Sequence, residues 1–153
     1  MSYGRDKKAI TESKKSKTLR ITLAVLYFIQ VVLTTFPFMW GVSEKGELKQ
    51  LTAFEVAVQP GGYDGAQDIK LAIIFAVLVL FPAVCFFFCI LNKTLVKDFL
   101  SIVCALTCAG IITFGIGGLI AMGGVVALLL YILILFLSTM SLLSSVAVQN
   151  TEE

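Results

Sequence analysis

The sequence predicts an all-α membrane protein, a bundle of four transmembrane helices with the N and C termini in the cytoplasm. Of its 153 residues, 58% are hydrophobic and only 14% are charged. The apolar residues fall in long uncharged runs, which suit lipid rather than water as the surrounding medium. Lysine and arginine gather in alternate segments between these runs, as the preference for positive charge on the cytoplasmic side predicts.

The chain starts with a basic tail, residues 1–20, in which seven lysine and arginine side chains stand against two acidic ones. Residues 21–40 contain no charge, and at about 1.5 Å per residue such a helix crosses the roughly 30 Å hydrocarbon layer. The first transmembrane helix is therefore predicted at 21–40. The alternative for this arrangement is a cleaved secretory signal, but the run is long for one and no small-residue cleavage motif follows it.

Residues 41–70 form a polar segment with three basic and five acidic side chains. This low positive charge predicts an extracytoplasmic loop, with Trp40 at the membrane edge. Helical spacing and strand-like alternation both occur among its apolar residues, which are Leu48, Leu51, Phe54, Val56 and Val58. The pattern leaves two interpretations open, an amphipathic segment resting on the membrane surface and a recognition surface for a partner.

Residues 71–91 are again uncharged and predict the second transmembrane helix. Pro82 lacks the N–H that would bond the carbonyl one turn earlier, so a bend is expected there, and Pro37 is expected to act in the same way near the end of the first helix. Residues 92–98 predict a short cytoplasmic connector, whose charged side chains are Lys93, Lys97 and Asp98.

The chain then carries no charge from residue 99 to residue 151, and a single helix of that length would extend about 80 Å, so the run must fold back once. Glycine disfavours helix, and the glycine-rich stretch near the middle marks the turn. The run divides into the third helix (99–114), an extracytoplasmic turn (115–124), the fourth helix (125–146) and a cytoplasmic tail (147–153).

The four cysteines are the most specific pattern in the sequence. Cys85 and Cys89, and likewise Cys104 and Cys108, are spaced four apart and share a helix face. An antiparallel hairpin centred on the connector would set Cys89 level with Cys104, and Cys85 level with Cys108. Such thiols are soft ligands for zinc or copper(I), or a redox pair. Helix packing is the favoured interpretation, because thiolates in hydrocarbon are costly and the spacing is not C-x-x-C.

The remaining polar groups in the predicted spans are neutral. Gln30 is expected to bond a neighbouring helix, because a lone amide in a span needs a partner. The fourth span is the richest in hydroxyls, with Ser138, Thr139, Ser141, Ser144 and Ser145. No aspartate, glutamate, histidine, lysine or arginine falls within the predicted spans, and this weakens the case for ion-coupled transport by one chain.

Enzymatic activity is not predicted. Histidine is absent from the sequence, which removes the commonest general base and metal ligand. No catalytic, cofactor-binding or metal-binding residue and no cofactor are predicted, and the four cysteines stay the one candidate set for a metal. The order of basic tail, span, outer loop and three closely spaced spans is similar in layout to claudin-like and other tetraspan proteins. The loop lacks the claudin cysteine pair, so no residue role is carried over.

The leading functional hypothesis is a non-enzymatic accessory or scaffold subunit of a membrane assembly, in the cell (plasma) membrane. The alternative is a small self-assembling pore or transporter for an ion or small solute. Expected partners are the lipid bilayer, anionic lipid headgroups at the basic tail, and other membrane subunits or further copies of the chain. A net charge of +2 gives no reason to expect a nucleic acid.

Overall fold

The computed structural model describes residues 14–42, 47–58, 69–91, 96–116 and 120–149. In chain order these residues form helix α1 (Lys14–Leu33), strands β1 (Pro37–Val42) and β2 (Leu48–Thr52), the short helix α2 (Ala53–Val58), helices α3 (Ile69–Leu91) and α4 (Val96–Gly110), the π-helical turn η1 (Ile111–Ile116) and helix α5 (Met122–Gln149).

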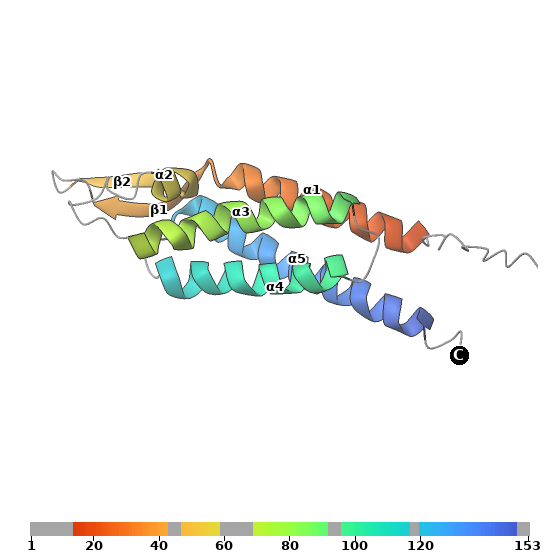
Figure 1. Cartoon of the computed structure of the whole chain (residues 1–153). Coiled ribbons are helices and arrows are strands. Elements are labelled where there is room, and N and C mark those ends of the chain that lie inside the picture. Colours follow the sequence, from red (N-terminus) through yellow and green to blue (C-terminus); the bar gives the residue numbers. More distant parts are fainter. Residues whose placement is uncertain (1–13, 43–46, 59–68, 92–95, 117–119, 150–153) are drawn as a thin grey trace, which may run out of the picture.

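The long helices α1, α3, α4 and α5 run lengthwise beside one another, and β1, β2 and α2 form a cap at one end (Figure 1). Within the described residues, four helices are long and apolar enough to cross a membrane. Their apolar windows are Ser16–Leu33, Ala72–Leu91, Val96–Gly115 and Met122–Ser144. The predicted set of four long apolar helices in a mostly helical chain is therefore confirmed.

The helices face one another along stripes of buried residues spaced alternately three and four apart. On α5 this stripe comprises Ala127, Tyr131, Ile134, Ser138 and Ser141. This spacing keeps one face turned to the partner helices, as in a left-handed bundle. Isoleucine, leucine, valine and phenylalanine side chains are exposed on the outer faces, while most buried polar groups lie inside the bundle. This distribution is the reverse of that in a water-soluble domain.

The first helix differs from its predicted range of 21–40, since α1 ends at Leu33 and Pro37 starts β1. The amides of Thr34, Thr35 and Phe36 each bond the carbonyl three residues earlier, at 3.1 to 3.2 Å, which tightens the last turn. Pro37 follows this tight turn, so it stops the helix instead of bending it. Trp40 consequently lies in a strand, paired with Gln50.

The cap is an antiparallel hairpin continued by α2. β1 and β2 pair from Val42 with Leu48 to Pro37 with Thr52, and the Phe38 carbonyl accepts a bond from the Ala121 amide at 3.0 Å. Leu51 and Val56 are buried against the bundle, whereas Leu48 and Phe54 are exposed. The spacing of the apolar residues in the predicted loop left helix and strand both open, and the structure has both, a strand up to Thr52 and a helix from Ala53.

A capping box fixes the start of α2. The Glu55 amide donates to the Thr52 hydroxyl oxygen at 3.0 Å, while the Thr52 amide and hydroxyl donate to Glu55 Oε2 at 2.9 and 3.0 Å. These reciprocal bonds satisfy amides that a helix start leaves without intrahelical partners. Because the bonds from Thr52 stabilise the charged carboxylate, the pKa of Glu55 is lowered from its ordinary value.

The second half of the bundle also differs from the predicted ranges. α4 begins at Val96, so Lys97 and Asp98 belong to the helix and not to the connector; the rest of that connector, residues 92–95, lies outside the described residues. The helical path continues beyond the predicted end at residue 114, through η1 to Ile116. α5 begins at Met122 and extends to Gln149, into the predicted tail.

Candidate functional site

The four cysteines are all buried and free, and they lie inside the bundle. The Cys104 thiol contacts those of Cys85 and Cys108. Cys89 lies instead beside Ser101. The predicted register of α3 and α4, with Cys89 level with Cys104 and Cys85 level with Cys108, is therefore wrong by about one helical turn. The reason is that α4 starts earlier than predicted, which moves the centre of the hairpin toward α3.

In the described part of the chain, no group of three or more histidine, cysteine, aspartate or glutamate side chains is placed to hold a metal ion. The cysteines instead pack among aromatic and small side chains, with Cys108 against Tyr131 of α5 and Cys85 Sγ 4.0 Å from the Leu100 carbonyl. This arrangement is what the packing interpretation of the cysteines requires.

The contact between Cys108 and Tyr131 sets the register of the antiparallel pair α4 and α5. In an antiparallel pair, residues that lie equally far before Cys108 on α4 and after Tyr131 on α5 are level with each other. Ser101 is therefore level with Ser138, and Asp98 with Ser141. All four of these side chains are buried. From α1, the Tyr27 hydroxyl donates to the Ser101 carbonyl at 3.2 Å. These side chains thus form a polar layer across the bundle, one to two helical turns from the end that lies opposite the cap.

The centre of this layer is an ion pair that the sequence analysis placed in a connector. Lys97 Nζ lies 3.0 Å from Asp98 Oδ2, with side-chain exposures of 2% and 0%. Neighbouring positions on a helix do not face each other, so the flexible lysine must curl round the helix to reach the carboxylate. The pair neutralises two charges that would otherwise be very costly to bury in the protein interior.

Three buried oxygens of this layer make no hydrogen bond within the described residues: Asp98 Oδ1, Ser101 Oγ and Ser138 Oγ. Such atoms are unusual in a well-packed interior, and each costs about 1 to 3 kcal/mol when it is left without a partner. They lie on the facing sides of α4 and α5. The layer therefore contains a buried ion pair together with buried oxygen atoms that have no hydrogen-bond partner among the described residues.

Gln30 occupies the opposite half of the bundle interior. Its side chain is 2% exposed, and Nε2 donates to the Ala127 carbonyl at 2.8 Å, joining α1 to α5. The prediction that this amide bonds a neighbouring helix is confirmed. The hydroxyls of α5 are split: Ser138 and Ser141 face the interior, whereas Thr139 is exposed and its hydroxyl returns to the Leu135 carbonyl at 2.7 Å.

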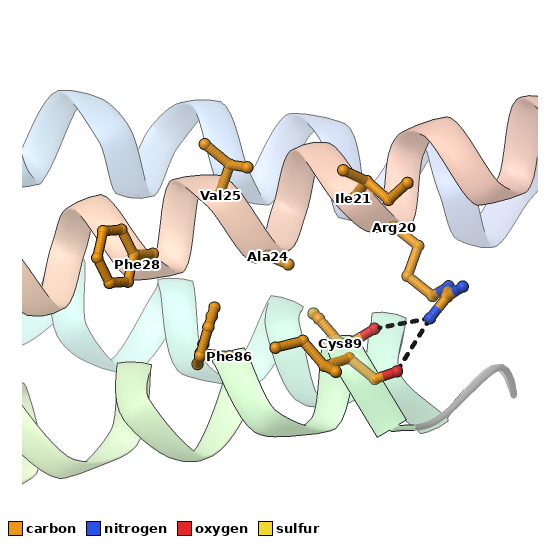
Figure 2. A pocket seen from close by; sticks show the side chains of 8 residues that line it. Arg20, Ile21, Ala24, Val25, Phe28, Phe86 and Cys89 are labelled. Carbon is orange, nitrogen blue, oxygen red and sulfur yellow. Dashed lines mark hydrogen bonds between the residues drawn. The ribbon is translucent and has the colours of Figure 1, made fainter.

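A groove of about 330 Å³ runs along the outer surface between α1 and α3 (Figure 2). Its lining residues are Arg20, Ile21, Ala24, Val25, Phe28, Phe86, Cys89 and Ile90. Arg20 stands at one end, where Nη1 donates to the Cys89 and Ile90 carbonyls at 3.3 and 3.0 Å. These are carbonyls of the last turn of α3, which lack intrahelical partners, so Arg20 also caps that helix.

Two of these features differ from the sequence-based prediction for a common reason. Arg20 was predicted as the last residue of the tail, and Lys97 with Asp98 as part of the connector, because charged residues were taken as the ends of the predicted spans. The structure instead continues α1 and α4 through these charges, and neighbouring helices supply their partners. Comparison with protein-family models, with curated proteins and with solved structures gives no match.

Proposed function

We propose that the chain is a multi-pass protein of the cell membrane, with both termini in the cytoplasm, that acts by association as a non-enzymatic accessory or scaffold subunit. The observation that carries this proposal is the distribution of side chains on the folded chain. Apolar residues cover the outer faces of all four long helices, and an ordered cap stands at one end. The basic residues at the opposite end support a cytoplasmic location for that end.

The cap is the part of the molecule suited to recognising a partner subunit. Leu48 is 68% exposed and Phe54 is 53% exposed, although the same segment buries Leu51 and Val56 on the bundle. β1 pairs on its other side with Ile120 through Met39, so among the described residues β2 provides the unpaired edge of the hairpin. Apolar side chains beside a strand edge favour association with another protein.

Affinity capture in mild detergent tests this proposal. The wild-type chain is expected to co-purify with a partner at fixed stoichiometry. Combined Leu48→Ser and Phe54→Ser substitutions are expected to release that partner without unfolding the bundle. Thr139→Val, on the outer face of α5, is the control and is expected to keep it. A wild-type chain that is recovered only as a monomer would contradict the association proposal.

The buried layer around Asp98 favours a second candidate, a transporter for an ion or small solute. Ionisable groups within apolar helices often mark a transport path. A pore lined between copies by the α5 hydroxyls is less suited to this chain, because Ser138 and Ser141 face its own interior. Purified protein in ion-loaded vesicles is expected to release solute, and Asp98→Asn is expected to stop the release. No flux above that of empty vesicles removes this candidate.

A further inference from the structure

We propose that one water molecule is bound inside the bundle between α4 and α5, held by Asp98, Ser101 and Ser138. The site consists of Asp98 Oδ1, Ser101 Oγ and Ser138 Oγ, three buried oxygens that make no hydrogen bond within the described residues. This inference goes beyond the proposed function, because it concerns how the bundle is held together, whichever partner or solute the protein serves.

The three oxygens come from two facing helices. Asp98 and Ser101 are three residues apart on α4 and therefore share a face of that helix. Ser138 lies on the facing side of α5, level with Ser101. All three residues have an exposure of 0%, so bulk water does not reach them in the folded chain. A single small molecule between the two helices is therefore placed to contact all three oxygens.

The occupant of this site must donate hydrogen bonds. Asp98 is ion-paired with Lys97 through Oδ2, and the remaining carboxylate oxygen, Oδ1, can only accept. The hydroxyls of Ser101 and Ser138 can donate, but neither bonds to Oδ1. Cys89 lies beside Ser101, but a thiol is a weak donor and does not satisfy the serine oxygen. A molecule with strong donors is therefore required.

The occupant must also be neutral. Lys97 and Asp98 already balance each other, so a cation bound at Oδ1 would give the buried layer a net positive charge. A divalent cation would in addition need about six or more oxygen ligands, of which this site supplies three. The carboxylate itself repels an anion. A neutral hydrogen-bond donor is the class of ligand that the charges of the layer allow.

The size of the site favours water among neutral donors. Serine is a small side chain, and Ser101 and Ser138 face each other, whereas two turns away on α5 the large side chain of Tyr131 fills the interface against Cys108. Buried waters typically make about three hydrogen bonds to polar groups that would otherwise lack partners. A water here can donate to Asp98 Oδ1 and to one serine oxygen and accept from the other hydroxyl, which satisfies all three oxygens.

The bound water has a structural role. It connects the Lys97–Asp98 ion pair on α4 to Ser138 on α5, so that one molecule bridges two helices. A shift of α4 along α5 by one turn would separate the three oxygens and leave each of them buried without a partner, which is costly. The water therefore helps to fix the register of α4 and α5.

Substitution of Ser138 distinguishes a bound water from a dry gap by the sign of the effect. Ser138→Ala removes one contact and leaves space for the water. Ser138→Val fills that space with methyl groups, so it is expected to expel the water and to leave Asp98 Oδ1 without a donor. In mild detergent its melting temperature is expected to lie about 2 to 4 °C below that of Ser138→Ala, the shift that corresponds to about one buried hydrogen bond.

Thr139→Val and Thr139→Ala are the matched controls, because residue 139 is exposed on the same turn of α5. The difference between them measures the preference of this helix for alanine over valine, and it is subtracted from the difference at residue 138. In a dry gap the added methyl groups would gain packing contacts and raise stability. A corrected melting temperature of Ser138→Val equal to or above that of Ser138→Ala would overturn the proposal.

A crystal structure of the full chain, at a resolution that shows ordered water, observes the site directly. One density peak is expected within hydrogen-bond distance of Asp98 Oδ1, Ser101 Oγ and Ser138 Oγ, and it is expected to be missing in Ser138→Val. Direct bonds among the three oxygens would overturn the proposal. A side chain from residues 92–95, which lie outside the described residues, in the place of the water would also overturn it.

A comparison of salts separates a bound water from a bound ion. Melting temperatures in sodium, potassium and choline chloride at equal ionic strength are expected to agree, because a water molecule requires no particular cation. Stabilisation by sodium or potassium that is lost in Asp98→Asn would identify a cation as the occupant. That result would overturn the water site and favour the transporter candidate instead.

Discussion

Lys97 and Asp98 are the charged side chains buried in the described part of the chain, and each depends on the other. Their ion pair has exposures of 2% and 0%, so water contributes little to solvating either charge. The net value of such a pair relative to apolar residues is small, because desolvation offsets the attraction. The cost of losing one partner is large, since the remaining charge is then buried alone.

Asp98→Ala is therefore expected to lower the free energy of unfolding by about 3 to 5 kcal/mol, because it leaves the Lys97 ammonium without a partner. Combining Lys97→Met with Asp98→Leu replaces both charges by apolar groups, and this variant is expected to be more stable than Asp98→Ala. Denaturant titration of the detergent-solubilised protein measures both. If the double variant is no more stable than Asp98→Ala, the Lys97 ammonium must reach water when Asp98 is removed. The ion pair would then be dispensable for stability.

Two glycines of α5 illustrate a second kind of constraint, the close approach of backbones. A Cβ atom at Gly124 would lie 2.7 Å from the Phe38 carbonyl oxygen and 2.8 Å from Ile120 Cγ2, and one at Gly123 would meet the Pro37 carbonyl oxygen. Backbone atoms of β1 cannot give way as a side chain can. The sequence analysis interpreted these glycines as a turn, but they let β1 pack on the first turn of a helix.

Gly124→Ala is expected to destabilise the protein by about 1 to 3 kcal/mol, the usual cost of overpacking. Gly110→Ala is the matched control, since nothing lies within 4 Å of a Cβ at that position. Alanine also favours helix over glycine by up to about 1 kcal/mol, so the control is expected to be neutral or stabilising. Denaturant titration compares the two variants, and equal losses of stability would contradict the close approach.

The ends of the helices show why hydropathy predicted their number and not their extent. Long uncharged runs locate the middle of each span, because the hydrocarbon layer requires them. The end of a helix depends on local bonding and on neighbouring elements instead. α1 stops at Leu33 because Pro37 cannot continue it, and α4 includes Lys97 and Asp98, whose charges neutralise each other inside the bundle. The register of α3 and α4 follows from that start.

The short helix α2 shows how a local motif sets an element of the cap. Thr52→Ala removes the side-chain acceptor of the capping box and is expected to cost about 1 kcal/mol of local stability. Hydrogen exchange of the amides from residue 53 to residue 58 measures this local opening. Glu47→Gln, which removes an exposed carboxylate outside the box, is the control and is expected to leave exchange unchanged.

The same box gives α2 a dependence on pH. The folded pKa of Glu55 lies below its ordinary value, so the stabilisation is fully present above that ordinary value and is lost as the pH falls through the lowered one. Protection of α2 amides, corrected for intrinsic exchange rates, is therefore expected to decrease on acidification below the ordinary glutamate pKa. The Glu55→Gln variant is expected to lack this decrease, and an unchanged dependence in that variant would assign the effect to another group.

The molecule as a whole has an apolar exterior, an interior containing polar groups, and two ends of different character. One end bears the cap, and the other bears the starts of α1 and α4 (Figure 1). Hydropathy and charge predicted the apolar exterior, because both can be read from one continuous stretch of sequence without knowing how the helices pack. The polar layer and the groove between α1 and α3 were not predictable, because each depends on which helix faces meet.

The buried cysteines allow the proposed orientation to be tested without altering the bundle. All four native thiols have exposures of 0% to 1%, so a water-soluble maleimide is expected to leave the folded wild-type chain unlabelled. Gln50→Cys places a thiol on exposed β2 in the cap, and Ser16→Cys places one at the opposite end without changing any charge. Each variant then reports the side of the membrane on which its end lies.

In intact cells, a membrane-impermeant maleimide is expected to label the Gln50→Cys variant and to spare the Ser16→Cys variant, which reacts only after permeabilisation. This result is expected because the basic end is retained in the cytoplasm, whereas the cap is translocated to the other side of the bilayer. Labelling of Ser16→Cys alone would invert the proposed topology, and labelling of both variants in intact cells would show that the bilayer does not separate the two ends. In either case the cap would lose its proposed role in recognising partners from outside the cell.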